Sequence, residues 1–205
     1  MRFVSWLHHI GRQGVAAVEF ALVAPVMILV LLAGTDVVTS MRVQIRLETT
    51  ATQLGQIVSQ CPRLTTGDAQ QLFTHGQRLI GGIGQVAGGT TAGAIIITAV
   101  YRVGDVNRVA WQQRSGSRTF VSSVGPDMRD QPATVDGGFI VPPEQTLIVT
   151  EIFLQRNPWI LTPGFFGGQS LVTAGATRMY LTRAVDAAAL SRPPEDQGAA
   201  LVCFA

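Results

Sequence analysis

The residue of this sequence best suited to chemistry is an acid inside an apolar segment. From Val15 to Gly34 the chain runs for about 20 residues, and Glu19 carries the only charge. An ionisable group inside a membrane segment is costly, so it indicates a function and a partner. If the chain is cut after Gly14, Val15 gains a free α-amine one helical turn from the Glu19 carboxylate, and the two charges can pair. A neighbouring subunit's amine could equally take the carboxylate and set the register between packed helices.

The other reactive side chains form no catalytic or metal-binding pattern. The motifs HExxH, CxxC and GxSxG are all missing from the sequence. The histidines are His8, His9 and His75. The paired acids, which lie in loop-like or tail-like sequence where solvated charge is usual, are Asp127 with Asp130 and Glu195 with Asp196. We therefore expect no catalytic residue, no metal and no cofactor.

Charge and composition narrow the class of protein. Fifteen Lys and Arg residues balance 13 Asp and Glu residues, which gives a formal net charge of +2. This near-balance argues against a nucleic-acid partner, which usually requires a concentrated basic face. Only 14% of the residues are charged, against roughly 25% in soluble domains. Part of the chain is therefore expected to avoid water, and the 205 residues leave room for one domain and an appendage.

Cys61 and Cys203 are the two cysteines of the chain. In an oxidising compartment a bond between them would close a very long loop and stabilise the fold by about 4 to 5 kcal/mol in the chain-entropy model. In the cytosol both would stay reduced. The sequence does not show whether their Cα atoms come within reach, so a disulfide and two separate thiols both stay open.

The apolar run is long enough to cross a membrane as a helix. At 1.5 Å per residue it spans about 30 Å, the thickness of the hydrocarbon core of a bilayer. Residues 1–14 carry Arg2 and Arg12 without an acid, which places the N-terminus in the cytoplasm and the bulk of the chain outside. Pro25 predicts at most a kink. A secretory signal peptide has a shorter apolar run, whereas a plain signal anchor, with Glu19 near the interface, stays open.

The segment Gly14-Val-Ala-Ala-Val-Glu19-Phe20 and the apolar run after it resemble a type IV prepilin processing site. They are most similar to those of TadE-like pseudopilins from the tight-adherence (Tad/Flp) pilus system. The resemblance implies that a membrane-embedded prepilin peptidase cuts between Gly14 and Val15 on the cytoplasmic side, with Glu19 and Phe20 serving recognition and assembly. It also implies other pilins and pseudopilins, the inner-membrane assembly platform and membrane lipid as partners.

Past the span, helical spacing continues to Gln60, where Cys61-Pro62 ends the helix. The expected apolar face consists of Val38, Met41, Ile45, Leu47, Leu54, Ile57 and Val58. The predicted organisation is a cleaved leader (1–14), a transmembrane helix (15–34), its amphipathic continuation (35–60) and an extracytoplasmic head (61–205). The protein would thus be a single-pass inner-membrane protein with a periplasmic head. Its incorporation into an extracellular pilus stays open.

The head is predicted to be an α+β domain with an antiparallel sheet, as in pilins. Thr66-Gly67-Asp68 is expected to cap a second helix over 69–80, and the glycine-rich run 81–89 is interpreted as a flexible connector. A long loop is expected over 126–143. The predicted strands are 94–103, 108–114, 118–124, 146–155 and 171–183.

A second, looser resemblance to TadE-like proteins lies in the second half of the head. An apolar strand with a Val-x-Glu core ends in a proline-aromatic bend at Pro158-Trp159. Glu151 in this strand is expected to pair with Arg178 or Arg102; the alternative is a strand position facing solvent.

These features favour a minor pilin or pseudopilin, not an enzyme. The main alternative is a membrane-anchored extracytoplasmic binding or sensing module with an uncleaved anchor. That alternative predicts no cleavage and tolerance of Glu19→Ala. A secreted enzyme is a third reading, which the absence of site chemistry disfavours.

Overall fold

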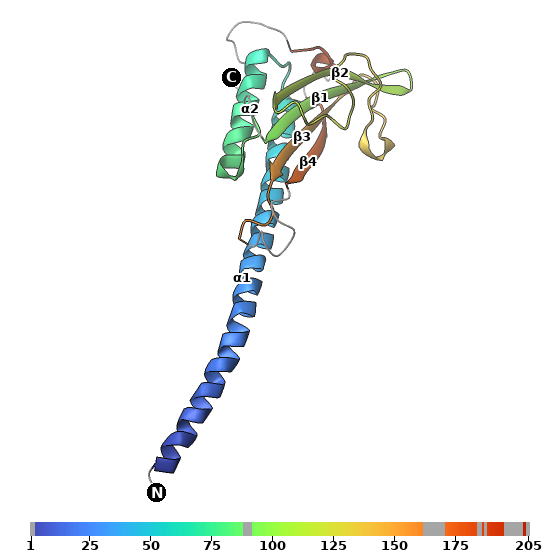
Figure 1. Ribbon diagram of the computed structural model, residues 1–205. Helices are drawn as coiled ribbons and strands as arrows, with labels where there is room; N and C mark the ends of the chain where they lie inside the picture. Colours follow the sequence, from blue (N-terminus) through green and yellow to red (C-terminus); the bar gives the residue numbers. More distant parts are fainter. Residues whose placement is uncertain are drawn as a thin grey trace. The chain divides into compact units, whose positions relative to one another are not determined.

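The computed structural model describes residues 3–87, 92–161, 171–183, 186, 188–194 and 203. It has the α+β architecture that the sequence predicted (Figure 1). Its helices and strands are α1 (Phe3–Gln60), α2 (Thr66–Ile80), β1 (Gly93–Val103), β2 (Val106–Gly116), β3 (Thr146–Arg156) and β4 (Val172–Leu181). By its internal contacts the chain divides into two compact units, residues 1–41 with 157–170 and residues 42–156 with 171–205.

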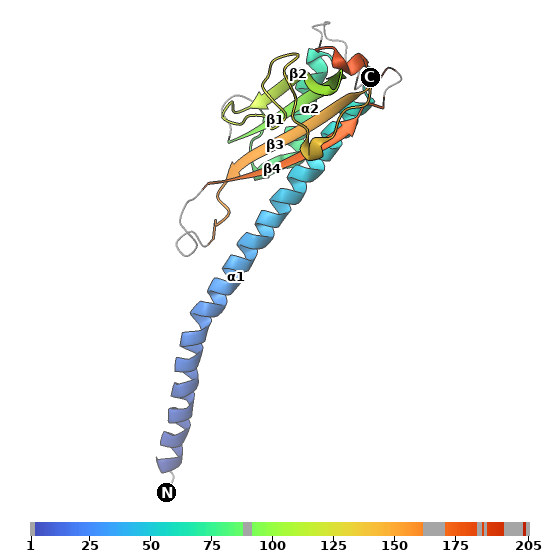
Figure 2. The same ribbon diagram turned by 90° about the vertical axis from the view of Figure 1, so that its right-hand side faces the viewer.

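The four strands form one antiparallel sheet in the order β2-β1-β3-β4 (Figure 2). β1 and β2 are joined by a tight turn at Gly104-Asp105, where Gly104 has a φ of 60°, so the predicted hairpin is confirmed. A bulge between Ala99 and Val100 shifts the register of this hairpin. The strands predicted over 146–155 and 171–183 are confirmed as β3 and β4.

In the second unit, α2 and the part of α1 from Arg42 onward cover one face of the sheet. Their shared core includes β1 and β3 residues such as Ile97 and Ile152. The buried face of α1 consists of Val43, Leu47, Ala51, Leu54 and Val58. The predicted face was therefore wrong in part, because Val38, Met41 and Ile45 are exposed. Both sets have helical spacing, and the choice between them depends on how the sheet lies against α1, which periodicity does not encode.

The second helix begins earlier than the sequence suggested. Its N-cap is Thr65, whose hydroxyl accepts from the Asp68 N–H at 3.1 Å, while the Asp68 carboxylate accepts from the Thr65 N–H at 3.1 Å. This reciprocal capping box replaces the predicted cap at 66–68. Gln77 of α2 binds the segment that follows the helix: its side-chain amide donates to the Gly84 carbonyl and accepts from the Val86 N–H. The part of the predicted flexible connector up to Ala87 is therefore held against α2; residues 88 and 89 lie outside the described residues.

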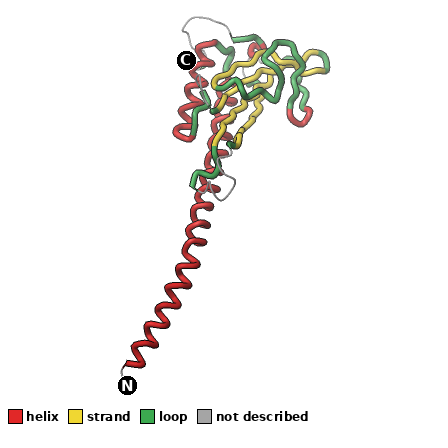
Figure 3. The backbone as a smooth tube through the Cα atoms, in the orientation of Figure 1, coloured by secondary structure: helices red, strands yellow, loops and turns green. Residues whose placement is uncertain are grey.

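The opposite face of the sheet is covered by the long chain segment between β2 and β3, drawn largely as loop in Figure 3. Val124, Val135 and Val141 from this segment form a second buried cluster with residues of β1, β2 and β3. β1 is therefore buried on both faces. This double burial explains why Ala94–Val100 is almost continuously apolar instead of alternating.

The strand predicted over 118–124 is absent. Gly116, with a φ of 97°, ends β2, and a Cβ there would lie 2.4 Å from the Gly93 carbonyl oxygen. The chain then crosses over the sheet instead of extending it. Phe120 stacks on Phe153 with ring centroids 5.4 Å apart, and Val124 enters the second cluster. Burial against residues that are distant in sequence thus overrides local β-propensity.

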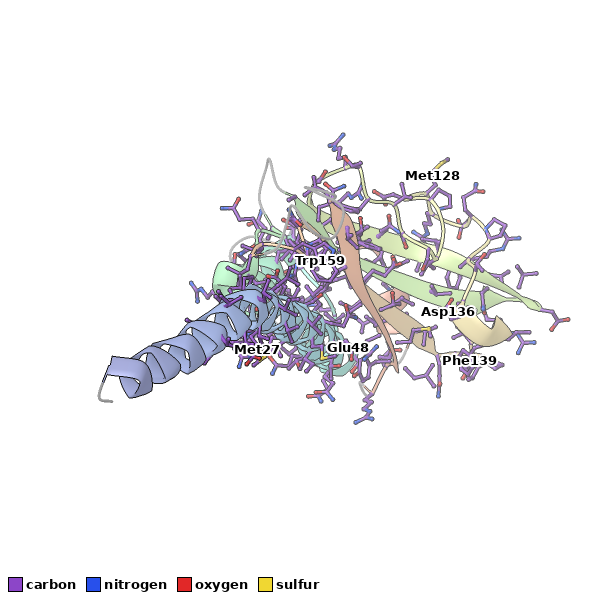
Figure 4. All side chains as sticks on the ribbon, turned by 60° about the horizontal axis from the view of Figure 1, so that its bottom comes forward. Met27, Glu48, Met128, Asp136, Phe139 and Trp159 are labelled. Atoms are coloured by element: carbon purple, nitrogen blue, oxygen red, sulfur yellow. A yellow bond between two sulfur atoms is a disulfide. The ribbon has the colours of Figure 1, made fainter. Side chains whose placement is uncertain are left out.

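Glu151 is fully buried on the loop-covered face, so both sequence interpretations of this residue were wrong. Arg178 instead pairs with Glu48 at 2.9 Å (Figure 4 labels Glu48), and Arg102 pairs with Asp105. The Glu151 carboxylate accepts from the Ser123 N–H at 2.9 Å, from the Ser123 hydroxyl at 2.7 Å and from the Ser122 hydroxyl. Hydrogen bonds from the crossing segment therefore take the place of a cation.

The structure joins Cys61 and Cys203 in a disulfide with Cα atoms 5.1 Å apart. Cys61 follows the end of α1 and lies in the helix-side core. The Cys203 N–H donates to the Asp68 carboxylate at 3.1 Å, which places this residue beside the α2 cap. Cap and disulfide together attach Cys203 to the start of the head.

Replacing Glu151 with Ala should lower the free energy of unfolding by about 2 to 4 kcal/mol, because the serine donors of the crossing segment lose their acceptor. Chemical unfolding of the full chain in detergent, followed by its tryptophan fluorescence, measures this change. Asp127→Ala is the matched control, since Asp127 is an exposed acid of the neighbouring loop. Equal stability of the two variants would contradict the assigned role of Glu151.

Removing the disulfide by Cys61→Ser with Cys203→Ser should cost about 4 to 5 kcal/mol of unfolding free energy in the chain-entropy model. Thermal unfolding with and without a reductant provides the comparison. The reductant should destabilise the unmodified chain and leave the double variant unchanged. An unmodified chain insensitive to reductant would show that the bond contributes nothing to stability.

Candidate processing and anchor site

The residues that the sequence assigned to processing and assembly all lie on α1. This helix is continuous from Phe3 to Gln60 and therefore runs through Gly14, Val15, Glu19 and Phe20. Val15 and Glu19, four residues apart, share one face of the helix. Phe20 is 73% exposed, and Val15 and Glu19 are exposed as well. The structure thus gives these residues a common helical setting and leaves their side chains accessible to a partner.

The segment after Gly14 forms an apolar helix that the rest of the described chain leaves uncovered. Its most apolar window has a mean hydropathy of 2.6, and none of that window is buried within the protein. Met27 lies in this exposed stretch (Figure 4). A core helix of a soluble protein would be covered by other elements. The length and apolar character of this helix suit membrane anchoring, and a signal sequence has the same composition.

Glu19 is a carboxylate on this uncovered apolar surface. Within the described part of the chain, no basic side chain forms an ion pair with it. An acid in such surroundings reaches toward the interface or pairs with a cation. The α-amine that cleavage before Val15 would create is one such cation, and a second subunit could supply another.

Asp36 is a second acid of the helix, and sequence reasoning did not single it out. It follows the apolar run and is only 2% exposed. Each of its carboxylate oxygens lies 3.1 Å from the backbone nitrogen of Leu161, which donates to it. The two residues are separated by 125 positions. An acid directly after a span was the available signal, but its backbone partner could not be identified from sequence.

The partner of Asp36 belongs to a short loop that follows β3. The bend predicted at Pro158-Trp159 is present, and the Trp159 N–H donates to the Asn157 side chain at 2.9 Å. Figure 4 labels Trp159. Ile160 is 63% and Leu161 47% exposed. A buried carboxylate on α1 therefore fixes a loop that presents apolar side chains at its surface.

Catalytic or metal chemistry finds no support among the described residues. They include no group of three or more His, Cys, Asp or Glu residues that could hold a metal ion. A hollow of about 580 Å³ lies in the second unit. It is lined by Phe139, Gln145, Leu147 and residues 179–183. Its lining contains Tyr180 and Arg183, but no acid, histidine or cysteine that could act as a general base or nucleophile.

Comparison with known protein families agrees with the resemblance found in the motif. Residues 14–54 match the family described as TadE-like protein, so the match begins at Gly14 and ends at Leu54 within α1. It covers about a fifth of the chain, and over this segment the protein is similar to that family. The TadE-like family implies a role in the Tad pilus system. Searches of curated proteins and of solved structures gave no match.

Replacing Asp36 with Ala should release the loop after β3. Loss of a charged acceptor weakens the local structure by about 1.5 to 3 kcal/mol, so amide exchange at Leu161 should accelerate roughly tenfold to a hundredfold. Hydrogen exchange with mass spectrometry on the full chain measures this rate. Asp36→Asn keeps one acceptor oxygen, so its exchange rate at Leu161 should lie between those of the unmodified chain and Asp36→Ala. Unchanged exchange at Leu161 in Asp36→Ala would refute the role of this contact.

Proposed function

We propose that this protein is a minor pilin or pseudopilin of a Tad/Flp pilus, matured by a prepilin peptidase that cuts between Gly14 and Val15. The observation that carries the proposal is the TadE-like match over residues 14–54, which begins at the glycine of the processing motif. Its uncovered apolar helix supports the same conclusion. Pilus components of this family are structural, and we assign no enzymatic activity to the chain.

The proposed mechanism is assembly through α1. Cleavage removes the basic leader, which includes Arg2 and Arg12, and leaves Val15 as the first residue. The new α-amine and the Glu19 carboxylate then lie one turn apart on the helix, so that each lowers the cost of holding the other in lipid. The same carboxylate can instead take the amine of an adjacent pilin. In that arrangement the charge pair fixes the axial register between two apolar helices.

The proposed location follows from the charge distribution around the span. The leader is basic and stays in the cytoplasm, so the chain is a single-pass inner-membrane protein with its head in the periplasm. The proposed partners are the prepilin peptidase, other pilins and pseudopilins, the assembly platform and membrane lipid. An oxidising periplasm also suits the Cys61–Cys203 disulfide.

Gly14→Leu should block maturation, because a pocket built around glycine rejects a large side chain and lowers processing by about tenfold or more. The experiment expresses the full chain with a C-terminal tag in cells with and without an active prepilin peptidase, and follows the loss of the leader by gel shift. Gly34→Leu is the matched control, since a side chain at this glycine further along α1 meets nothing within 4 Å. It should be processed normally.

The outcomes separate the proposal from its alternative. Peptidase-dependent processing that Gly14→Leu abolishes and Gly34→Leu preserves would support the pilin assignment. A leader retained by the unmodified chain in peptidase-positive cells would instead support the membrane-anchored binding or sensing module. Cleavage by a general signal peptidase beyond residue 34 would contradict both readings.

A further inference from the structure

The loop held by Asp36 is bound to α1 directly after its apolar run. Asp36 follows Val15 by about 21 residues, which corresponds to a rise of about 32 Å along the helix axis. The hydrocarbon core of a bilayer is about 30 Å thick. With Val15 at one edge of this core, Asp36 and the Leu161 N–H bound to it therefore lie in the headgroup region on the other side.

The composition of the loop is suited to that region. Trp159 has the amphipathic ring that is enriched at membrane interfaces. The neighbouring Ile160 and Leu161 are large apolar residues that are 63% and 47% exposed. The polar groups nearby are bound internally, because the Asp36 carboxylate accepts from Leu161 and the Thr35 hydroxyl donates to the Leu31 carbonyl at 2.8 Å. The loop thus offers large apolar side chains to lipid.

From this placement we propose that the loop Asn157–Leu161 is a second membrane contact of the protein. Ile160 and Leu161 insert shallowly into the leaflet at the C-terminal end of the span, with Trp159 at the boundary between headgroups and acyl chains. Asp36 is the positioning residue that holds the loop at this depth. The inference rests on the membrane anchoring of α1 in the proposed function, and lipid is the favoured occupant because the exposed loop continues the exposed surface of the span.

The consequence is a restriction on how the helix can move. A single spanning helix is free to rotate about its axis and to tilt in the bilayer. A loop that is attached to one side of the helix at Asp36 and inserts into the leaflet would restrict both rotation and tilt. It would also keep lipid, not another helix, next to that side. The opposite sides of α1 would then be available for other helices during assembly.

The test places an environment-sensitive fluorophore at single cysteines of the full chain in lipid nanodiscs under non-reducing conditions. Ile160→Cys reports on the loop, Met27→Cys on the span, and Met128→Cys is the matched control, since Met128 is 60% exposed on a loop of the head. The nanodiscs contain phosphatidylcholine spin-labelled either near the headgroup or deep in the acyl chain. The Ile160 label should be quenched about twofold more than the Met128 label, and most by the shallow quencher.

A Met27 label that is quenched while the Ile160 label behaves like Met128 would overturn the inference and leave the anchor intact. An unquenched Met27 label would instead contradict the anchoring of α1 itself. A blue-shifted Ile160 label that lipid quenchers do not reach would mean that protein covers the loop, which also overturns the inference. Adding Asp36→Ala to the Ile160 reporter should reduce quenching by about half, and unchanged quenching would contradict the positioning role of Asp36.

Discussion

The main constraint on this protein is its apolar helix, which the described part of the chain leaves uncovered. The exposed stretch after Gly14 has a mean hydropathy of 2.6, and burying such a surface is worth roughly 25 cal/mol for each Å² removed from water. Lipid or the helices of other subunits can provide that burial. The length and apolar character of the helix suit anchoring in a membrane, and the TadE-like match over residues 14–54 implies a role in the Tad pilus system.

Three carboxylates lie in apolar surroundings, and they differ in which groups bind them. Glu151 is fully buried and accepts hydrogen bonds from Ser122 and Ser123. Asp36 is buried and accepts from a backbone N–H, that of Leu161. Glu19 remains exposed on the uncovered helix. The first two acids are bound within the chain, whereas Glu19 forms no ion pair with a basic side chain of the described residues.

The features that the sequence predicted well depend on local patterns. The course of α1 to Gln60, the hairpin of β1 and β2 and the strands β3 and β4 follow from apolar runs and turn residues. The motif at Gly14 was recognised because its spacing is local, and the family match covers the same residues. Cleavage there stays a prediction.

The features that it missed depend on contacts between distant residues. Residues 118–124 have the composition of a strand, but they cross the sheet because Glu151 and Phe153 bind them there. Asp36 could not be recognised as a loop anchor, since its partner is a backbone N–H 125 residues away. The buried side of α1 was likewise assigned in part to the wrong residues, because the position of the sheet decides between two helical stripes.

The intact mass of the protein recovered from cells that carry the pilus system tests the central claim most directly. The account predicts a chain that begins at Val15, with the α-amine free beside Glu19. A chain that retains residues 1–14 in the presence of an active prepilin peptidase would contradict it.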